Sequence, residues 1–237
     1  MPISNWISDN YIEVFGAITG IIYVFLEIRQ SIWLWPVGIV TSAVYILVFF
    51  SSKFYADMSL QGYYLIISCI GWYWWRKGSK AQRLNGSVAE EESGRRGEGE
   101  NWRGGDMETD NRIPGNKDEV ILIVTTLKLK TGMILGVVSV FLYTGMWLVL
   151  SKLTDSPVPE WDAFITSLSI VATWMLARKI YEHWYLWIIV NFVSAALFIT
   201  RGLYPTVILY LVYGFMSFAG LIAWKKTIVV SLKEGEK

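Results

Sequence analysis

The chain has few charged residues, one cysteine and one histidine among its 237 residues. Charged residues make up 17% and apolar residues 54% of the sequence, whereas an average soluble domain has about 25% and about 45–50%. The single cysteine, Cys69, excludes an intrachain disulfide and a thiolate metal site. The net charge is only +1, and no basic face is evident outside the loops, so the sequence shows no basic surface that would bind a nucleic acid. The composition therefore indicates a membrane protein that neither carries out redox chemistry nor binds nucleic acid.

Groups that would support catalysis are also scarce. The sequence contains no Gly-x-Ser-x-Gly or His-Glu-x-x-His motif, so an intramembrane hydrolase or metalloenzyme is not expected. His183 lies in a short loop outside the apolar segments, and we interpret it as a solvated residue. The last apolar segment lacks the lysine that a retinal Schiff base needs. We therefore expect no enzyme activity and no cofactor.

What the sequence does contain is a series of long apolar segments. A membrane-spanning helix needs roughly 20 mostly apolar residues, with a range of about 17–25. Seven segments come close: Tyr11 to Ile28, Trp33 to Phe50, Leu60 to Trp75, Thr131 to Leu150, Ala163 to Ala177, Trp184 to Ile199 and Val207 to Trp224. Backbone polar groups in lipid must be paired within the segment, which predicts seven transmembrane helices.

The polar segments predict the orientation in the membrane. Residues 78–119 are rich in Gly, Glu, Arg, Asn and Ser, which predicts a disordered cytoplasmic loop. Asp9 and Glu13, with no Lys or Arg ahead of them, argue against a cleavable signal peptide. Most Lys and Arg residues beside the spans fall on one face, which places the N-terminus outside and the C-terminus in the cytoplasm.

Sliding the chain by 149 residues against itself reveals an internal repeat. Residues that then coincide are Phe15 and Phe164, Arg29 and Arg178, Trp35 and Trp184, Phe49 and Phe198, Tyr55 and Tyr204, Tyr64 and Tyr213, Gly71 and Gly220, and Trp75 and Trp224. This register predicts an all-α membrane protein with a first three-helix repeat over 11–77, a linking helix within 120–151 and a second three-helix repeat over 160–226. A single linking helix gives both repeats the same orientation in the membrane, so the repeats are parallel. Transporters built this way bind substrate between their repeats.

The polar side chains within the predicted spans indicate which kind of solute the protein could carry. The middles of the spans hold almost no Asp, Glu, Lys or Arg, and Glu27 lies near the end of the first span. Such scarcity argues against a proton- or sodium-driven pump. Amides, hydroxyls and aromatic rings remain, which suit a solute with hydroxyl groups and a flat ring, and would also attract a cationic ring.

Two groups of residues have alternative interpretations. Tryptophans are enriched at membrane interfaces. We therefore expect interfacial anchors rather than substrate ligands at Trp72, Trp74, Trp75, Trp161 and Trp224. Asn191 and Gln61 lie about two turns into their spans, where an amide either bonds a neighbouring helix or binds substrate.

Several short motifs combine aromatic, small and polar residues in both halves of the chain. The first half contains Trp35-Pro36-Val37-Gly38-Ile39, Tyr55-Ala56-Asp57, Leu60-Gln61 with Tyr64, and Gly71-Trp72-Tyr73-Trp74. The second half contains Trp161-Asp162-Ala163, Trp184-Tyr185-Leu186-Trp187 with Asn191, and Tyr204, Tyr210 and Tyr213. Together these motifs resemble the PnuC family of nicotinamide riboside transporters. The resemblance extends over nearly all of the chain except the polar loop.

The resemblance implies a bacterial inner-membrane facilitator with a 3+1+3 fold like that of SWEET sugar transporters, assembled as a homotrimer in the lipid bilayer. It implies facilitated diffusion of a vitamin precursor that a cytoplasmic kinase then traps. The substrate site it implies contains Trp35, Gln61, Tyr64, Trp184, Trp187, Asn191 and Tyr213. Thiamine or riboflavin transport, a sugar facilitator, and a structural or signalling subunit that transports nothing remain alternatives.

Overall fold

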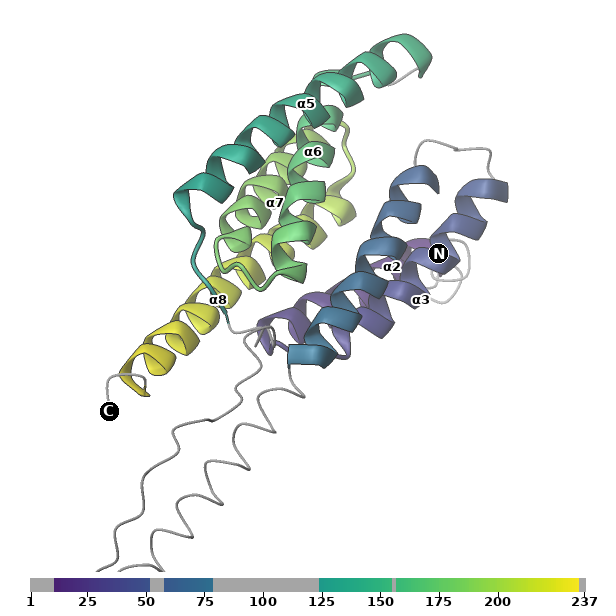
Figure 1. Ribbon diagram of the computed structural model, residues 1–237. Helices are drawn as coiled ribbons and strands as arrows, with labels where there is room; N and C mark the ends of the chain where they lie inside the picture. Colours follow the sequence, from purple (N-terminus) through teal and green to yellow (C-terminus); the bar gives the residue numbers. More distant parts are fainter. Residues whose placement is uncertain (1–10, 52–57, 79–123, 155–156, 235–237) are drawn as a thin grey trace, which may run out of the picture.

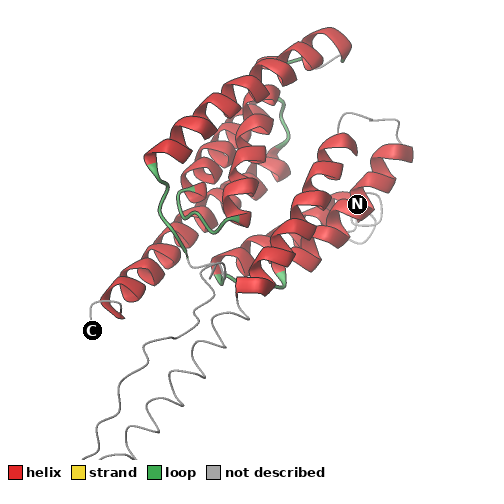
Figure 2. Cartoon of the chain, viewed as in Figure 1, coloured by secondary structure: helices red, strands yellow, loops and turns green. Residues whose placement is uncertain are grey.

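The computed structural model describes residues 11–51, 58–78, 124–154 and 157–234. In this part of the chain, seven helices account for almost all residues, and Figure 2 shows only short loops between them. The helices are α2 (Tyr11–Ile28), α3 (Leu34–Ser51), a helix over 58–78, α5 (Leu129–Leu153), α6 (Pro159–Ala177), α7 (His183–Thr200) and α8 (Tyr204–Glu234). Each of the seven predicted spans falls on one of these helices. The predicted 78–119 loop and the Tyr55-Ala56-Asp57 motif lie outside the described residues, apart from Gly78.

Several helices are long and apolar enough to cross a membrane. By length and composition these are α5, α7 and the Tyr204–Ile228 part of α8, while Val14–Ile28 and Leu34–Val48 form shorter apolar stretches. No residue of α5 is buried within the protein, although this helix is strongly apolar. An apolar surface of this kind is suited to lipid rather than to water.

The helices form two groups with α5 on the outside. Figure 1 shows α2, α3 and the helix over 58–78 as one group, and α6, α7 and α8 as the other. We call these the first and second helix groups. Helix α5 packs against α6, and α2 of the first group packs against α8 of the second. Residues 124–128 lead into α5 without regular secondary structure, apart from a parallel bridge between Thr125 and Ile180.

The same contacts recur in both groups at the predicted offset of 149 residues. A Cβ atom on Gly71 would overlap the ring of Trp35, and a Cβ atom on Gly220 would overlap the ring of Trp184. Glycine at both positions lets an indole lie directly against the neighbouring helix backbone. This recurrence supports the repeat predicted from the sequence.

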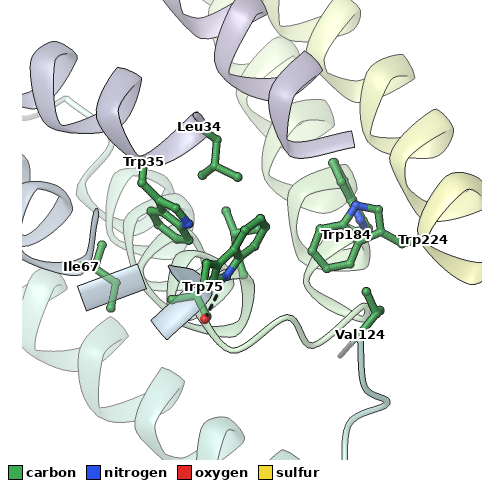
Figure 3. Close-up of a cluster of buried hydrophobic side chains, with 9 residues drawn as sticks. Leu34, Trp35, Ile67, Trp75, Val124, Trp184 and Trp224 are labelled. Carbon is green, nitrogen blue, oxygen red and sulfur yellow. Dashed lines mark hydrogen bonds between the residues drawn. The ribbon is translucent and has the colours of Figure 1, made fainter. Parts of the chain in front are cut away.

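A buried cluster joins the two groups at one end. We call it the tryptophan cluster, and its members are Leu34, Trp35, Ile67, Trp75, Val124, Leu176, Ala177, Trp184 and Trp224 (Figure 3). The indole Nε1 of Trp75 donates to the carbonyl oxygen of Ala177 at 3.3 Å, and that of Trp224 donates to the carbonyl oxygen of Glu27 at 3.0 Å. Each bond crosses from one helix group to the other.

The interfacial position expected for Trp75 and Trp224 is therefore wrong. Their exposed fractions are only 2% and 0%, because each indole fills space between the groups and finds a backbone acceptor there. Trp161, by contrast, is 52% exposed, as an interfacial side chain should be.

Candidate functional site

A cavity of about 450 Å³ lies between the two helix groups. Its walls come from α2, α3, the helix over 58–78, α6, α7 and α8, whereas no residue of α5 contributes. Small-molecule sites in proteins typically enclose about 300–1,000 Å³. The cavity therefore has the size of a ligand site and the location expected between two repeats.

The cavity brings together six of the seven residues predicted for the site. These residues are Gln61, Tyr64, Trp184, Trp187, Asn191 and Tyr213. Trp35 does not line the cavity, although it occupies the position equivalent to Trp184. Its side chain is fully buried in the tryptophan cluster, with its ring centroid 5.4 Å from that of Trp75 in an edge-to-face contact. The structure thus gives Trp35 a packing position.

Asn191 both bonds to a neighbouring helix and lines the cavity. Its side-chain Nδ2 donates to the Ser217 hydroxyl at 3.2 Å, and that hydroxyl donates to the backbone oxygen of Tyr213 at 2.8 Å. The same side chain also lines the cavity. The bond to α8 holds the amide in one orientation at the cavity wall.

One lining tyrosine from each helix group contacts a helix of the opposite group. Tyr213 places its hydroxyl against Gly20 of α2, and Tyr64 interacts with the side chain of Ser169 on α6. Tyr64 and Tyr213, like Gly20 and Ser169, are 149 residues apart. These reciprocal contacts place one aromatic ring from each group in the cavity wall.

Two indole donors at the cavity have no acceptor within the described part of the chain. The Nε1 atoms of Trp184 and Trp187 are buried without a hydrogen-bond partner there. A buried donor without an acceptor costs about 1–3 kcal/mol, and such groups in native structures call for an explanation. The Nε1 atom of Trp35, which does not line the cavity, likewise has no partner among the described residues.

A buried acid and histidine form the feature that sequence reasoning missed. The Nε2 atom of His183 lies 3.0 Å from Oε1 of Glu27, and its Nδ1 atom lies 2.7 Å from the carbonyl oxygen of Ile180. The interpretation of His183 as a solvated residue is wrong, since its exposed fraction is 0%. Glu27 is also buried and lines the cavity. The repeat register held a signal for this pair, because the equivalent positions carry two leucines.

Comparison with known proteins assigns the chain to a family. A family model described as nicotinamide mononucleotide transporter matches residues 10–226. The chain belongs to this transporter family. The curated relatives are transporters and not enzymes. The apolar helices agree with a multi-pass membrane protein. The predicted resemblance to PnuC proteins is confirmed.

Individual relatives carry two different substrate names. The nicotinamide riboside transporter PnuC of Escherichia coli (strain K12) is 24% identical over 223 residues, which cover 91% of this chain and 85% of that protein. The riboflavin/roseoflavin transporter RibM of Streptomyces davaonensis is 24% identical over 230 residues, covering 93% of this chain and 92% of that protein. A crystal structure of the vitamin B3 transporter PnuC matches with a TM-score of 0.63 and 21% identity, covering 95% of this chain and 85% of that chain.

Proposed function

We propose that this protein takes up nicotinamide riboside across the bacterial inner membrane by facilitated diffusion. The observation that carries the proposal is the cavity between the helix groups, with its aromatic, amide and hydroxyl lining. Nicotinamide riboside combines a cationic pyridinium ring, a carboxamide and a hydroxylated ribose. Each aromatic face near a cationic ring contributes about 0.5–2 kcal/mol, and the amides and indole donors suit the carboxamide and hydroxyl groups.

The proposed substrate site contains Gln61, Tyr64, Trp184, Trp187, Asn191 and Tyr213. The wall is uneven, because Trp187 and Asn191 of α7 occupy positions equivalent to Gly38 and Ser42 of α3. The second group therefore offers the large ring and the amide, whereas at Gly38 of the first group Ser68 and Tyr23 pack close to the backbone. A flat ring would bind on the α7 side, with its polar groups toward Gln61 and Tyr64.

Transport by this route requires the cavity to open alternately to each side of the membrane. The two helix groups are proposed to act as parallel repeats that rock around the central site. The tryptophan cluster lies beside Arg29, Arg76 and Arg178, at the end proposed to face the cytoplasm, with the N-terminus outside and the C-terminus inside. We further propose that the protein works as a homotrimer and that cytoplasmic phosphorylation traps the nucleoside.

Riboflavin is the second candidate, because RibM matches nearly its full length to this chain. Riboflavin has a larger, uncharged ring system, so it would use stacking and hydrogen bonding without cation–π attraction. Thiamine, which also has a cationic ring, is a third substrate to compare.

The test is uptake of labelled nicotinamide riboside into proteoliposomes that contain the purified protein. Saturable uptake that unlabelled nicotinamide riboside inhibits at lower concentration than thiamine or riboflavin supports the proposal. Stronger inhibition by riboflavin, together with uptake of labelled riboflavin, would favour the second candidate. Absence of uptake of all three compounds would favour a structural or signalling subunit.

A further inference from the structure

The contact between Glu27 and His183 breaks the correspondence between the two halves of the chain. At the offset of 149 residues, Glu27 corresponds to Leu176, and His183 corresponds to Leu34. All four side chains are buried, with exposed fractions of 2% or less. Leu34 and Leu176 belong to the tryptophan cluster. The positions of α2 and α7 that meet between the two helix groups thus carry an acid and a histidine, whereas the equivalent positions of α6 and α3 both carry leucine.

Stability alone does not account for the polar pair. Replacing a buried ion pair with apolar residues of similar size is often neutral or stabilising. The chain itself contains this apolar solution at the equivalent positions. A buried ionisable group in a membrane protein is by default a candidate functional residue.

The bond to Ile180 determines how the pair is oriented. Because a carbonyl oxygen only accepts, Nδ1 of His183 carries a hydrogen, and Nε2 is the atom that faces Glu27. The pair is then either a carboxylate with an imidazolium or a carboxylic acid with a neutral imidazole, and its total charge is zero in both cases. Glu27 lines the cavity and His183 does not, so in the ionised form the negative member of the pair is the one in the cavity wall.

Glu27 is the one acidic side chain among the described residues that line the cavity, and no lysine, arginine or histidine from the described residues lines it. The other ionisable lining groups are the tyrosines Tyr23, Tyr64, Tyr210 and Tyr213. Trp184, whose indole nitrogen has no acceptor among the described residues, belongs to the same lining and contacts His183 with ring centroids 4.7 Å apart and ring planes 39° apart. A positive ring in the cavity would favour the carboxylate form of Glu27.

We propose that Glu27, oriented by His183, makes the cavity select a cationic aromatic solute over an uncharged solute of the same shape. This inference rests on the proposed transport of nicotinamide riboside and adds a specificity-determining residue to it. His183 acts as a positioning residue, because it holds the carboxylate and does not line the cavity.

The test compares nicotinamide riboside with its reduced 1,4-dihydropyridine form, which has nearly the same shape and no ring charge. Wild-type protein should bind and transport the cationic form in preference to the reduced form. In Glu27→Gln, the amide can still donate to Nε2 of His183, and the preference should fall at least about tenfold, which corresponds to about 1.4 kcal/mol. Affinity for the uncharged form should change much less, which separates loss of charge selection from general damage.

The double variant E27L/H183L places at both positions the leucine found at the equivalent positions, 176 and 34, and serves as a second test. It should insert, remain folded and show the same loss of preference as Glu27→Gln. Glu160→Gln, which removes a carboxylate from an exposed position on α6, is the matched control and should keep the wild-type preference.

Each remaining outcome has a defined meaning. An unchanged preference in both variants, with nicotinamide riboside still transported, would overturn this inference alone. Loss of folded protein in both variants would give the pair a structural role and also overturn it. Failure of the wild-type protein to take up nicotinamide riboside would overturn the proposed function, and this inference with it.

Discussion

Gln30 and Lys179 lie 149 residues apart in the chain, and both have a backbone φ of 52°. Each lies just after the end of a helix. The backbone N–H of the next residue donates a hydrogen bond to a carbonyl oxygen in the last turn, from Ser31 to Leu26 and from Ile180 to Met175. Helices often end this way, usually with glycine at the left-handed position. A side chain at both positions carries a small conformational cost, so equivalent turns have kept the same unusual conformation.

Lys179 gives a prediction about stability and pH. Its ammonium group lies 4.4 Å from the ring centroid of Trp75, and burial lowers the pKa of Lys179 from its ordinary value of 10.5. Below that ordinary value the unfolded chain binds more protons than the folded one, so wild-type stability should rise with pH in this range. The stability difference between Lys179→Met and wild type should therefore change in favour of wild type from pH 7 to pH 10, as measured by thermal unfolding in detergent. Lys130→Met, at an exposed position on α5, is the control, and an equal pH trend in both variants would contradict the prediction.

The glycines beneath the two indoles give a second prediction. In Gly71→Ala and Gly220→Ala, the added methyl group overlaps the ring of Trp35 or Trp184, and overpacking of this kind costs about 1–3 kcal/mol. Both variants should unfold several degrees below wild type. Gly62→Ala is the matched control, because nothing lies within 4 Å of its added Cβ and alanine favours a helix interior by roughly 0.5–1 kcal/mol. Equal unfolding temperatures for the three variants would show that these close contacts are absent.

The amides of the proposed site give a third prediction. Asn191→Leu and Gln61→Leu should each weaken binding of nicotinamide riboside by about 5- to 100-fold, since loss of a buried hydrogen-bond partner costs about 1–3 kcal/mol. Titration calorimetry on the purified variants measures the change, and uptake should fall in parallel. Ile189→Leu, on an exposed side of α7, should leave binding unchanged. Normal uptake by an inserted Asn191→Leu or Gln61→Leu variant would remove that residue from the site.

The energetics of transport give a fourth prediction. Glu27 is the one carboxyl group among the described residues that line the cavity, and its pair with His183 keeps zero charge wherever the shared proton lies. Exchange of labelled nicotinamide riboside across proteoliposomes should therefore persist when a protonophore collapses the proton gradient. A severalfold loss of exchange in wild type that Glu27→Gln does not show would instead indicate proton coupling through this pair.

Part of the fold could be predicted because membrane insertion leaves a strong local signal. Each span needs a continuous apolar run to satisfy its backbone in lipid, so the seven helices could be read directly from hydropathy. The register between Trp35 and Trp184, or between Gly71 and Gly220, needed only self-comparison of the sequence. Six of the seven predicted site residues line one cavity, and these residues were predicted from the resemblance to the PnuC family.

The predictions that failed concern burial between distant segments. Trp75, Trp224 and His183 lie near helix ends, where hydropathy alone suggests exposure to the interface or to water. Whether such a side chain is buried depends on what the opposite helix group presents to it. The acceptor of Trp224 is 197 residues away and the partner of His183 is 156 residues away, so no local pattern could reveal either contact.

The amino-acid sequence by itself therefore determined the membrane character, the number of helices and the family, because each follows from composition or order along the chain. The tertiary structure alone decided which of two equivalent tryptophans, Trp35 or Trp184, lines the cavity, and that Glu27 lies there with His183 behind it. The physical reason is that hydropathy acts along each segment separately, whereas a cavity wall exists only after both helix groups have packed against each other.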